Sequence, residues 1–178
     1  PGAFAYIQTV DILNETLKGD FTPVIQRDTF RSYNYRYRDY PEILGVGCEL
    51  LTWLDISLSH KIPAFNDTLV KVNEDAPLRL TSYDNFIRNS DKFALQQDLT
   101  IQFLRERRLD AMCPAFIQRK YLGAATYYLL SGKREISRER IHAIHQFYFS
   151  KIFILILSYL PLAVSKFFFR HYKLRFSK

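Results

Sequence analysis

From about residue 84 onward, apolar positions recur at the spacing of amphipathic helices. A first helix is predicted to begin near Ser90 or Asp91 and to end in the basic run 105–108. A second follows Pro114 and ends before Gly132, because glycine suits the position just after a helix. A third is predicted to start near Ser137 and to reach Phe147. The pattern therefore indicates a helical region over 89–146.

The first half of the chain has shorter and less regular apolar segments. Residues 3–17 fit either a strand or a short helix, and residues 21–25 and 64–72 have the pattern of short strands. Residues 48–59 carry apolar positions at helical spacing and predict a helix. The polar, Tyr-rich stretch 31–41 predicts a loop.

An apolar run at 147–169 contains only two charges, Lys151 and Lys166, with fourteen uncharged residues between them. A transmembrane helix needs about 20 apolar residues, and Pro161 would kink a single helix. Lys151 could extend toward the lipid–water interface, and the basic residues after the run suit an anionic membrane leaflet. We favour attachment to a membrane surface. A buried core helix, a dimer interface and a true membrane span are the alternatives.

Charge is distributed unevenly along the 178 residues. Residues 1–100 carry 10 Lys/Arg and 14 Asp/Glu, whereas residues 101–178 carry 15 and 4, a net charge of +11. Basic residues interleaved with aromatic ones at 105–134 resemble nucleic-acid binders in composition. However, no binding motif accompanies them, and most lie at predicted helix ends, where they offset the helix dipole. We therefore expect no nucleic-acid partner.

The two cysteines, Cys48 and Cys113, are far apart and form no CxxC pair, which fits a reducing compartment. No secretory signal opens the chain. Together with the apolar run, these features predict a cytoplasmic protein that is peripheral on the inner face of the membrane. The chain begins at Pro1, close to an apolar segment, and we expect its natural N-terminus to lie upstream.

The strongest candidate for chemistry lies in residues 45–55, where a Gly-rich turn leads into the predicted helix with Glu49 in its first turn. A helix N-terminus favours a carboxylate, and Trp53 follows four residues later on the same face. This arrangement suits a general base beside an aromatic platform for a sugar ring. It also suits an acidic first turn with a buried Trp, which is the commoner explanation of such a pattern.

Other chemical signals are weaker. His142 and His145 have a spacing that can bind a metal ion, but no carboxylate or Cys is placed to complete the site. The sequence contains no P-loop, GxGxxG, GxSxG or HExxH motif.

Four segments, read in order, resemble the C-terminal half of family 2 glycosyltransferases of the GT-A type. Residues 21–30 are similar to a strand with an Arg at its end, and residues 47–55 to a Gly-Glu-Asp-x-x-x-Trp helix start. Residues 61–70 are similar to the strand that follows, and residues 73–82 to a polar loop near the donor diphosphate. In the second segment Cys48 stands where the family has Glu.

The resemblance implies an α/β fold, namely an incomplete GT-A (Rossmann-like) C-terminal half followed by an α-helical, membrane-apposed tail. It divides the chain into an acceptor-side part at 1–88, a helical extension at 89–146, and an apolar and basic membrane-associated segment at 147–178. The donor-binding half would lie outside these residues. The chain alone is therefore expected to be inactive.

The chemistry implied by the resemblance is inverting transfer of a sugar from a nucleotide-sugar donor to a hydroxyl acceptor. The acceptor would be a glycan or a lipid-linked molecule in surface polysaccharide or glycolipid synthesis. Glu49 would act as the catalytic base in place of the family's Asp, and Trp53, Asn73 and Arg79 would bind substrate. A divalent metal, Mg or Mn, would be bound mainly outside this chain.

A second function stays open at this point. The basic second half and the apolar run also fit a non-catalytic, membrane-associated helical interaction protein whose first half is only a scaffold.

Overall fold

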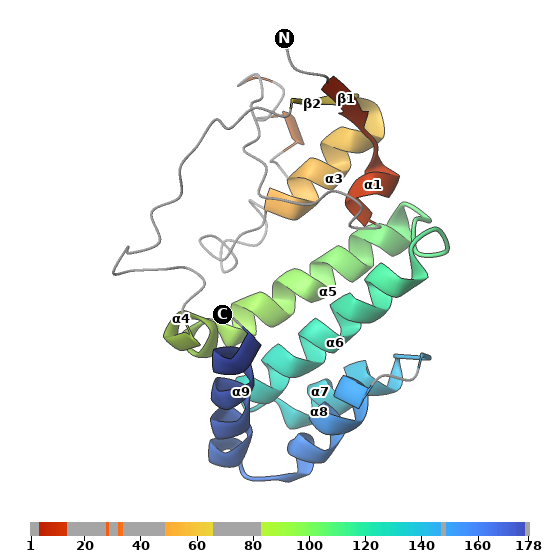
Figure 1. Ribbon diagram of the computed structural model, residues 1–178. Coiled ribbons are helices and arrows are strands. Elements are labelled where there is room, and N and C mark those ends of the chain that lie inside the picture. Colours follow the sequence, from red (N-terminus) through yellow and green to blue (C-terminus); the bar gives the residue numbers. More distant parts are fainter. Residues whose placement is uncertain are drawn as a thin grey trace. The chain divides into compact units, whose positions relative to one another are not determined.

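The computed structural model describes residues 4–13, 28, 32–33, 49–65, 83–146 and 149–176. Within these ranges the chain is mostly helical and contains one sheet of two strands (Figure 1). The chain forms two compact units, Pro1–Pro77 and Leu78–Lys178.

The first unit combines a two-stranded sheet with two helices. Strand β1 (Phe4–Ile7) pairs antiparallel with strand β2 (Ile62–Phe65), so that Phe4 lies opposite Phe65. Helix α1 (Thr9–Leu13) follows β1, and helix α3 (Glu49–Ser59) precedes β2. The two helices are joined by a hydrogen bond of 2.9 Å between the hydroxyl oxygens of Thr9 and Ser57.

The core of this unit is aliphatic. Its fully buried apolar side chains come from both helices: Leu13, Leu51, Leu54 and Ile56. The predicted helix at 48–59 is confirmed over residues 49–59, the part of it that the structure describes. Residues 3–17, which fitted either a strand or a helix, contain one of each.

The second unit is helical throughout its described residues. Its helices are α4 (Tyr83–Arg88), α5 (Ser90–Glu106), α6 (Pro114–Leu130), α7 (Arg134–His142), α8 (Phe149–Tyr159) and α9 (Leu162–Phe176). The long helices α5 and α6 lie side by side in Figure 1, joined by a short connection. Short connections of this kind favour antiparallel neighbours.

Local signals explain where α6 begins and ends. Pro114 occupies the first turn, where its missing N–H costs no helical hydrogen bond. Gly132 follows the helix with a φ of 86°, in the left-handed region that glycine tolerates best. Its N–H donates to the Leu129 carbonyl at 3.0 Å, and the Lys133 N–H donates to the Tyr128 carbonyl at 2.9 Å. These two bonds form a Schellman motif, which satisfies carbonyls that the helix end leaves open.

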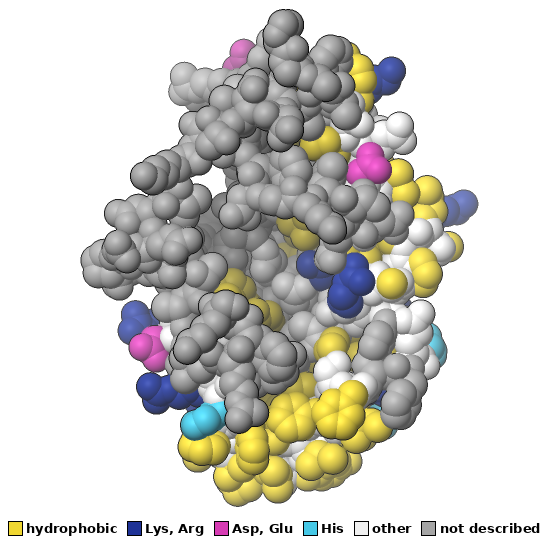
Figure 2. Space-filling view, in the orientation of Figure 1, with side chains coloured by type: hydrophobic (Ala, Val, Ile, Leu, Met, Phe, Trp, Pro, Cys, Tyr) yellow, Lys and Arg dark blue, Asp and Glu magenta, His cyan; other side chains and the backbone are white. Residues whose placement is uncertain are grey.

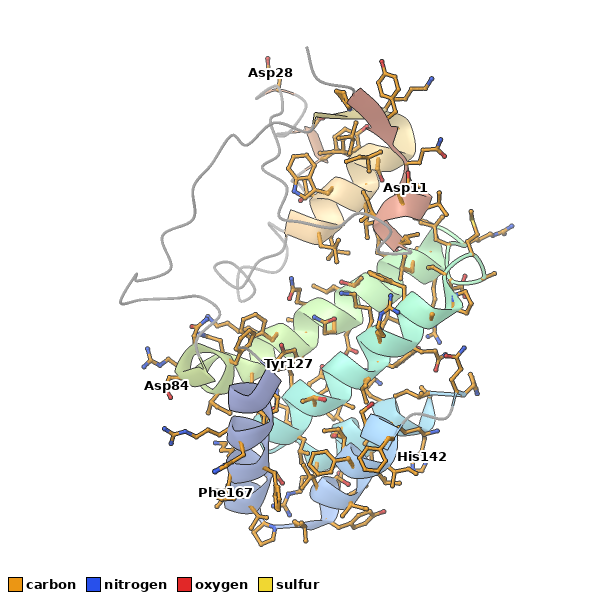
Figure 3. The ribbon with its side chains drawn as sticks, in the orientation of Figure 1. Asp11, Asp28, Asp84, Tyr127, His142 and Phe167 are labelled. Carbon is orange, nitrogen blue, oxygen red and sulfur yellow. The ribbon has the colours of Figure 1, made fainter. Side chains whose placement is uncertain are left out.

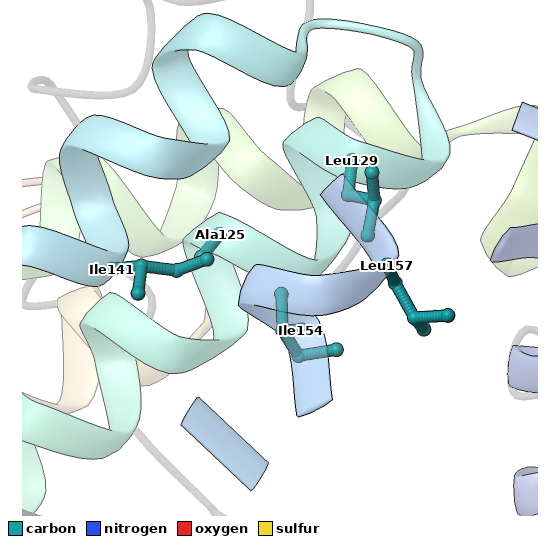
Figure 4. Close-up of a cluster of buried hydrophobic side chains, with 5 residues drawn as sticks. All are labelled: Ala125, Leu129, Ile141, Ile154 and Leu157. Carbon is teal, nitrogen blue, oxygen red and sulfur yellow. The ribbon is translucent and has the colours of Figure 1, made fainter. Parts of the chain in front are cut away.

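A cluster of buried side chains joins α6, α7 and α8. It consists of Ala125, Leu129, Ile141, Ile154 and Leu157 (Figure 4). A buried hydrogen bond reinforces the contact between α6 and α7, because the Ser137 hydroxyl donates to the Ala125 carbonyl at 2.7 Å. Helix α7 was predicted to begin near Ser137 and to reach Phe147. It begins earlier, at Arg134, and ends at His142.

The apolar run divides at Pro161, as the sequence predicted. Helix α8 ends at Tyr159 and α9 begins at Leu162, and the Ser165 hydroxyl donates to the Leu157 carbonyl at 2.9 Å across the break. Within the described part of the chain, none of the helices has the length and hydropathy needed to cross a membrane. Lys151 does not extend outward, since its ammonium group donates to the Ile144 carbonyl.

The predicted α/β fold, an incomplete GT-A (Rossmann-like) half, is wrong for the described residues. A Rossmann-like half is built on parallel strands joined by helical crossovers, whereas the one sheet found here is an antiparallel pair. The strand expected at 64–72 begins earlier, at Ile62, and is described only as far as Phe65. The strand expected at 21–25 lies outside the described residues. The segments 89–146 and 147–178 both belong to the second unit.

Candidate functional site

The first candidate site is the N-terminal end of α3. Glu49 is the first residue of this helix that the structure describes, and a helix N-terminus is where the helix dipole favours negative charge. Trp53 lies one helical turn further along and is partly buried. The structure thus places these two predicted site residues on one turn of one helix.

The other acid of α3 is not available to a substrate. Asp55 is 3% exposed, and its neighbour Thr52 is 2% exposed. A carboxylate so deeply buried in the packed side of the helix cannot take a proton from an external hydroxyl group. Glu49 is therefore the acid of α3 that is left as a candidate base among the described residues.

Two further groups mark the other end of α3. The Tyr33 hydroxyl and His60 Nδ1 lie 3.2 Å apart, and the two rings meet edge to face with centroids 5.6 Å apart. Sequence reasoning assigned no role to this pair. Asn73 and Arg79, the other two predicted substrate-binding residues, lie outside the described residues.

A polar network in the second unit joins three helices. Asp98 of α5 accepts a hydrogen bond of 2.7 Å from the Tyr128 hydroxyl of α6. The same carboxylate accepts two bonds from the Arg140 guanidinium of α7, at 2.8 and 3.0 Å. The pairing is bidentate, the strongest geometry for an arginine and a carboxylate.

The network changes the proton affinity of its members. Burial, together with the bond to Asp98, raises the pKa of the Tyr128 hydroxyl. The bond to Asp98 raises the pKa of the Arg140 guanidinium as well. Tyr128 therefore stays protonated as a donor, and the Asp98 carboxylate accepts three hydrogen bonds from its two partners. This arrangement holds α5, α6 and α7 together.

Sequence reasoning missed this network. The available signal was Asp98 itself, a charged residue between the apolar positions Leu95 and Leu99 of the predicted helix. A charge at such a position normally has a partner, because burying an unpaired charge is costly. The identity of the partners depends on how α5, α6 and α7 pack, which no local pattern reveals.

Cys113 is the buried cysteine at the start of α6. Burial, and then the nearby Asp110 carboxylate, raise the pKa of its thiol. The thiol donates to the Leu109 carbonyl at 3.0 Å. A protonated, buried thiol is a poor nucleophile, so Cys113 serves packing.

The described residues do not provide a metal site. No group of three or more His, Cys, Asp or Glu side chains among them could hold a metal ion. His142 and His145 are exposed, and Asp84 and His142 lie on separate helices (Figure 3). None of these side chains is therefore assigned to the divalent ion that the resemblance implies.

An apolar cavity of about 520 Å³ lies between α6, α8 and α9. Its walls are mostly aliphatic and aromatic, with Arg119 and Ser150 among the few polar contributors. Tyr127 also lines it, and burial raises the pKa of this tyrosine to about 12. The volume is in the range of small-molecule sites, and the walls suit hydrocarbon groups rather than a sugar or a phosphate.

No protein-family model matches the chain, and neither the curated proteins nor the solved structures contain a match.

Proposed function

We propose that the chain is part of an inverting glycosyltransferase, with Glu49 as the base that activates the acceptor hydroxyl. The observation that carries the proposal is the position of Glu49 in the first described turn of α3, since the resemblance requires a helix with an acid near its start. The proposal concerns the reaction and this residue. It does not extend to the α/β fold.

Two features of α3 support Glu49 in this role. Asp55, the alternative acid of the helix, is buried. Trp53, one turn from Glu49, is only partly buried, so part of its ring can border a site at this helix end. Aromatic rings of this kind offer an apolar face to a sugar ring.

The proposed step is a single displacement. The Glu49 carboxylate accepts the proton of the acceptor hydroxyl while the hydroxyl oxygen forms a bond to the anomeric carbon of the donor sugar. The bond from that carbon to the diphosphate oxygen breaks, and the nucleoside diphosphate leaves with the bonding electrons. Attack from the face opposite the leaving group inverts the anomeric configuration. The structure assigns no described residue to the donor diphosphate.

The test is sugar transfer by the full-length protein carrying Glu49→Gln. Glutamine keeps the size of the side chain but cannot accept the proton, so transfer is expected to fall by about 10²–10⁴-fold. Release of nucleoside diphosphate from a panel of UDP- and GDP-sugars, in the presence of hydroxyl acceptors, measures the loss. Thermal unfolding of the same protein should be unchanged.

The matched control is Asp11→Asn, which removes the first-turn acid of α1 in the same unit. This variant should keep the transfer rate of the unmodified protein. If Glu49→Gln transfers sugar as fast as Asp11→Asn, Glu49 is not the base.

The second candidate is a non-catalytic, membrane-associated helical interaction protein. It is favoured by the helical second unit, in which Asp98 holds three helices together and Cys113 is buried. This candidate predicts no sugar transfer by the full-length protein with any donor of the panel, whatever residue stands at position 49.

A further inference from the structure

Helix α8 is apolar on more than one side. Its inner side contributes Ile154 and Leu157 to the buried cluster with α6 and α7. Lys151 is its one charged residue, and the Lys151 ammonium is held by the Ile144 carbonyl. A helix that is apolar all round is normally buried on all sides, in a protein core or in lipid.

The outer side of α8 is nevertheless uncovered. Four large apolar side chains lie three or four residues apart along it and are exposed: Phe149 (82%), Ile152 (38%), Ile156 (56%) and Tyr159 (68%). This spacing puts them on one face of the helix, and we call them the α8 stripe. Figure 2 shows hydrophobic side chains gathered at the lower end of the view, over α8 and α9.

The neighbouring helix extends this apolar surface. Phe167 and Phe168 of α9 are 57% and 42% exposed, and Figure 3 shows Phe167 on α9. Phe149 also lines the apolar cavity between α6, α8 and α9. The exposed stripe is therefore continuous with an apolar hollow.

Positive charge borders the apolar surface. Lys166 and Arg170 lie on α9 beside the two phenylalanines, and the Arg138 guanidinium lies over the Tyr159 ring at 5.2 Å. No Asp or Glu follows Glu139 in the sequence. A partner that is apolar in one layer and negatively charged in the next would match this surface.

We propose that the α8 stripe, with Phe167, Phe168 and the adjoining basic residues, docks on an anionic phospholipid membrane. The apolar side chains enter the acyl boundary of one leaflet, and Lys166 and Arg170 contact lipid phosphates and carboxylates. A second copy of the chain fits less well, because a symmetric contact would bring the same positive charges together. The proposal is independent of the sugar-transfer proposal, since it involves none of the same residues.

The first experiment measures co-sedimentation of the 178-residue chain with vesicles of two compositions. One contains phosphatidylcholine alone, and the other contains about 30% phosphatidylserine. Binding is expected with the vesicles that contain phosphatidylserine. It is expected to weaken in about 1 M salt, because screening shortens the range of the electrostatic attraction to about 3 Å. Failure to bind anionic vesicles at low salt overturns the proposal.

Two variants then test the two layers of the surface. Ile156→Ser is expected to weaken binding by about 10-fold or more, because a largely buried aliphatic side chain is lost from the lipid-bound state. Lys166→Gln combined with Arg170→Gln is expected to weaken it by about 25-fold, since each basic group near an anionic surface contributes roughly 5-fold.

Matched controls exclude a general effect on folding or charge. Met112 is 60% exposed in the turn before α6, so Met112→Ser removes a similar apolar area at another place. Arg88→Gln combined with Arg105→Gln removes the same charge from α4 and α5. Circular dichroism verifies that every variant is folded.

Both controls should bind anionic vesicles at least about 5-fold more tightly than the corresponding test variants. Equal binding by Ile156→Ser and Met112→Ser would overturn the role of the α8 stripe. If the chain forms dimers that Ile156→Ser dissociates while vesicle binding is absent, a second copy covers the stripe and the membrane proposal is wrong.

Discussion

Asp98 links three helices of the second unit through a single carboxylate. Its partners come from α6 and α7, and both distances and geometry are those of charge-assisted bonds. The carboxylate is 19% exposed and the Arg140 side chain 31%. Solvent therefore weakens the ion pair, but the loss of one partner would still leave a half-buried charge.

Replacing Asp98 should destabilise the second unit. Asp98→Asn removes the negative charge that accepts from Arg140 and Tyr128, and we expect the free energy of unfolding to fall by about 1–2 kcal/mol. Urea denaturation followed by circular dichroism measures it. Glu139→Gln is the control, because Glu139 is 69% exposed and lies 4.0 Å from the same guanidinium. An equally large loss of unfolding free energy for Glu139→Gln would show that the Asp98 network contributes no more to stability than an exposed charge.

Tyr127 should make the protein sensitive to alkali. The pKa of this tyrosine is raised from 10 to about 12 by burial, so the folded state holds the phenolic proton that the unfolded chain releases. Its contribution to stability is complete below pH 10 and is lost as the pH rises toward 12. Unfolding free energies measured across this range should fall less steeply for Tyr127→Phe. Parallel curves for the two proteins would contradict the assignment.

At the scale of the element, two helix ends show the same geometry with different residues. Gly132 ends α6 with a φ of 86°, and Arg108 follows α5 with a φ of 54°. After α5, the Arg108 N–H donates to the Arg105 carbonyl and the Leu109 N–H to the Leu104 carbonyl. Both ends are Schellman motifs, but a side chain at the left-handed position is unfavourable.

Gly132→Ala should destabilise the protein by about 1–2 kcal/mol through backbone strain. Among the described residues, a new methyl group would meet only the Leu162 side chain, at 3.6 Å, so a clash is not the cause. Gly123→Ala is the control within α6, where the methyl group would lie 3.5 Å from Gln97 and the helical backbone favours alanine. This variant should gain up to about 1 kcal/mol. Equal melting temperatures for the two variants would refute the argument.

Arg108→Gly should have the opposite effect. It relieves the left-handed backbone at the end of α5, and we expect a gain of about 0.5–1 kcal/mol despite the greater freedom of glycine in the unfolded chain. The denaturation midpoints of Arg108→Gly and Gly132→Ala should therefore shift in opposite directions from that of the unmodified protein. A destabilised Arg108→Gly would mean that the Arg108 side chain, rather than its backbone, matters at this turn.

These helix ends also show what sequence can predict. Pro114, Gly132 and Pro161 were sufficient to place the ends of α6 and the break between α8 and α9, because each acts through its own backbone. The turn at Arg108 had no such signal. The N-terminal boundary of α7 was missed because the Gly132 turn leads directly into the helix at Arg134.

At the scale of the whole molecule, the error in fold class has an identifiable cause. The short apolar segments of the first half predicted a strand at 64–72 that overlaps β2 at residues 64–65. A run of four residues does not indicate which strand it pairs with or in which direction. The antiparallel pairing of β1 with β2 brings together residues about sixty positions apart, and such pairing depends on the intervening chain. The resemblance supplied a parallel α/β context that the described residues do not have.

The candidate site was predictable only in part. The sequence located Glu49 at the start of a helix because a Gly-rich turn and apolar spacing are local signals. It could not show that Asp55 is buried, since that depends on which side of α3 faces α1. The Asp98 network and the exposed side of α8 required the packing of helices, and no local pattern contained them.

The most direct test of the central claim is the steady-state kinetics of Glu49→Gln in the full-length protein. If Glu49 is the base, kcat falls by about 10²-fold or more while KM for the acceptor stays close to that of the unmodified protein, because only the transition state loses an interaction. An unchanged kcat, or a rise in KM alone, would contradict the account.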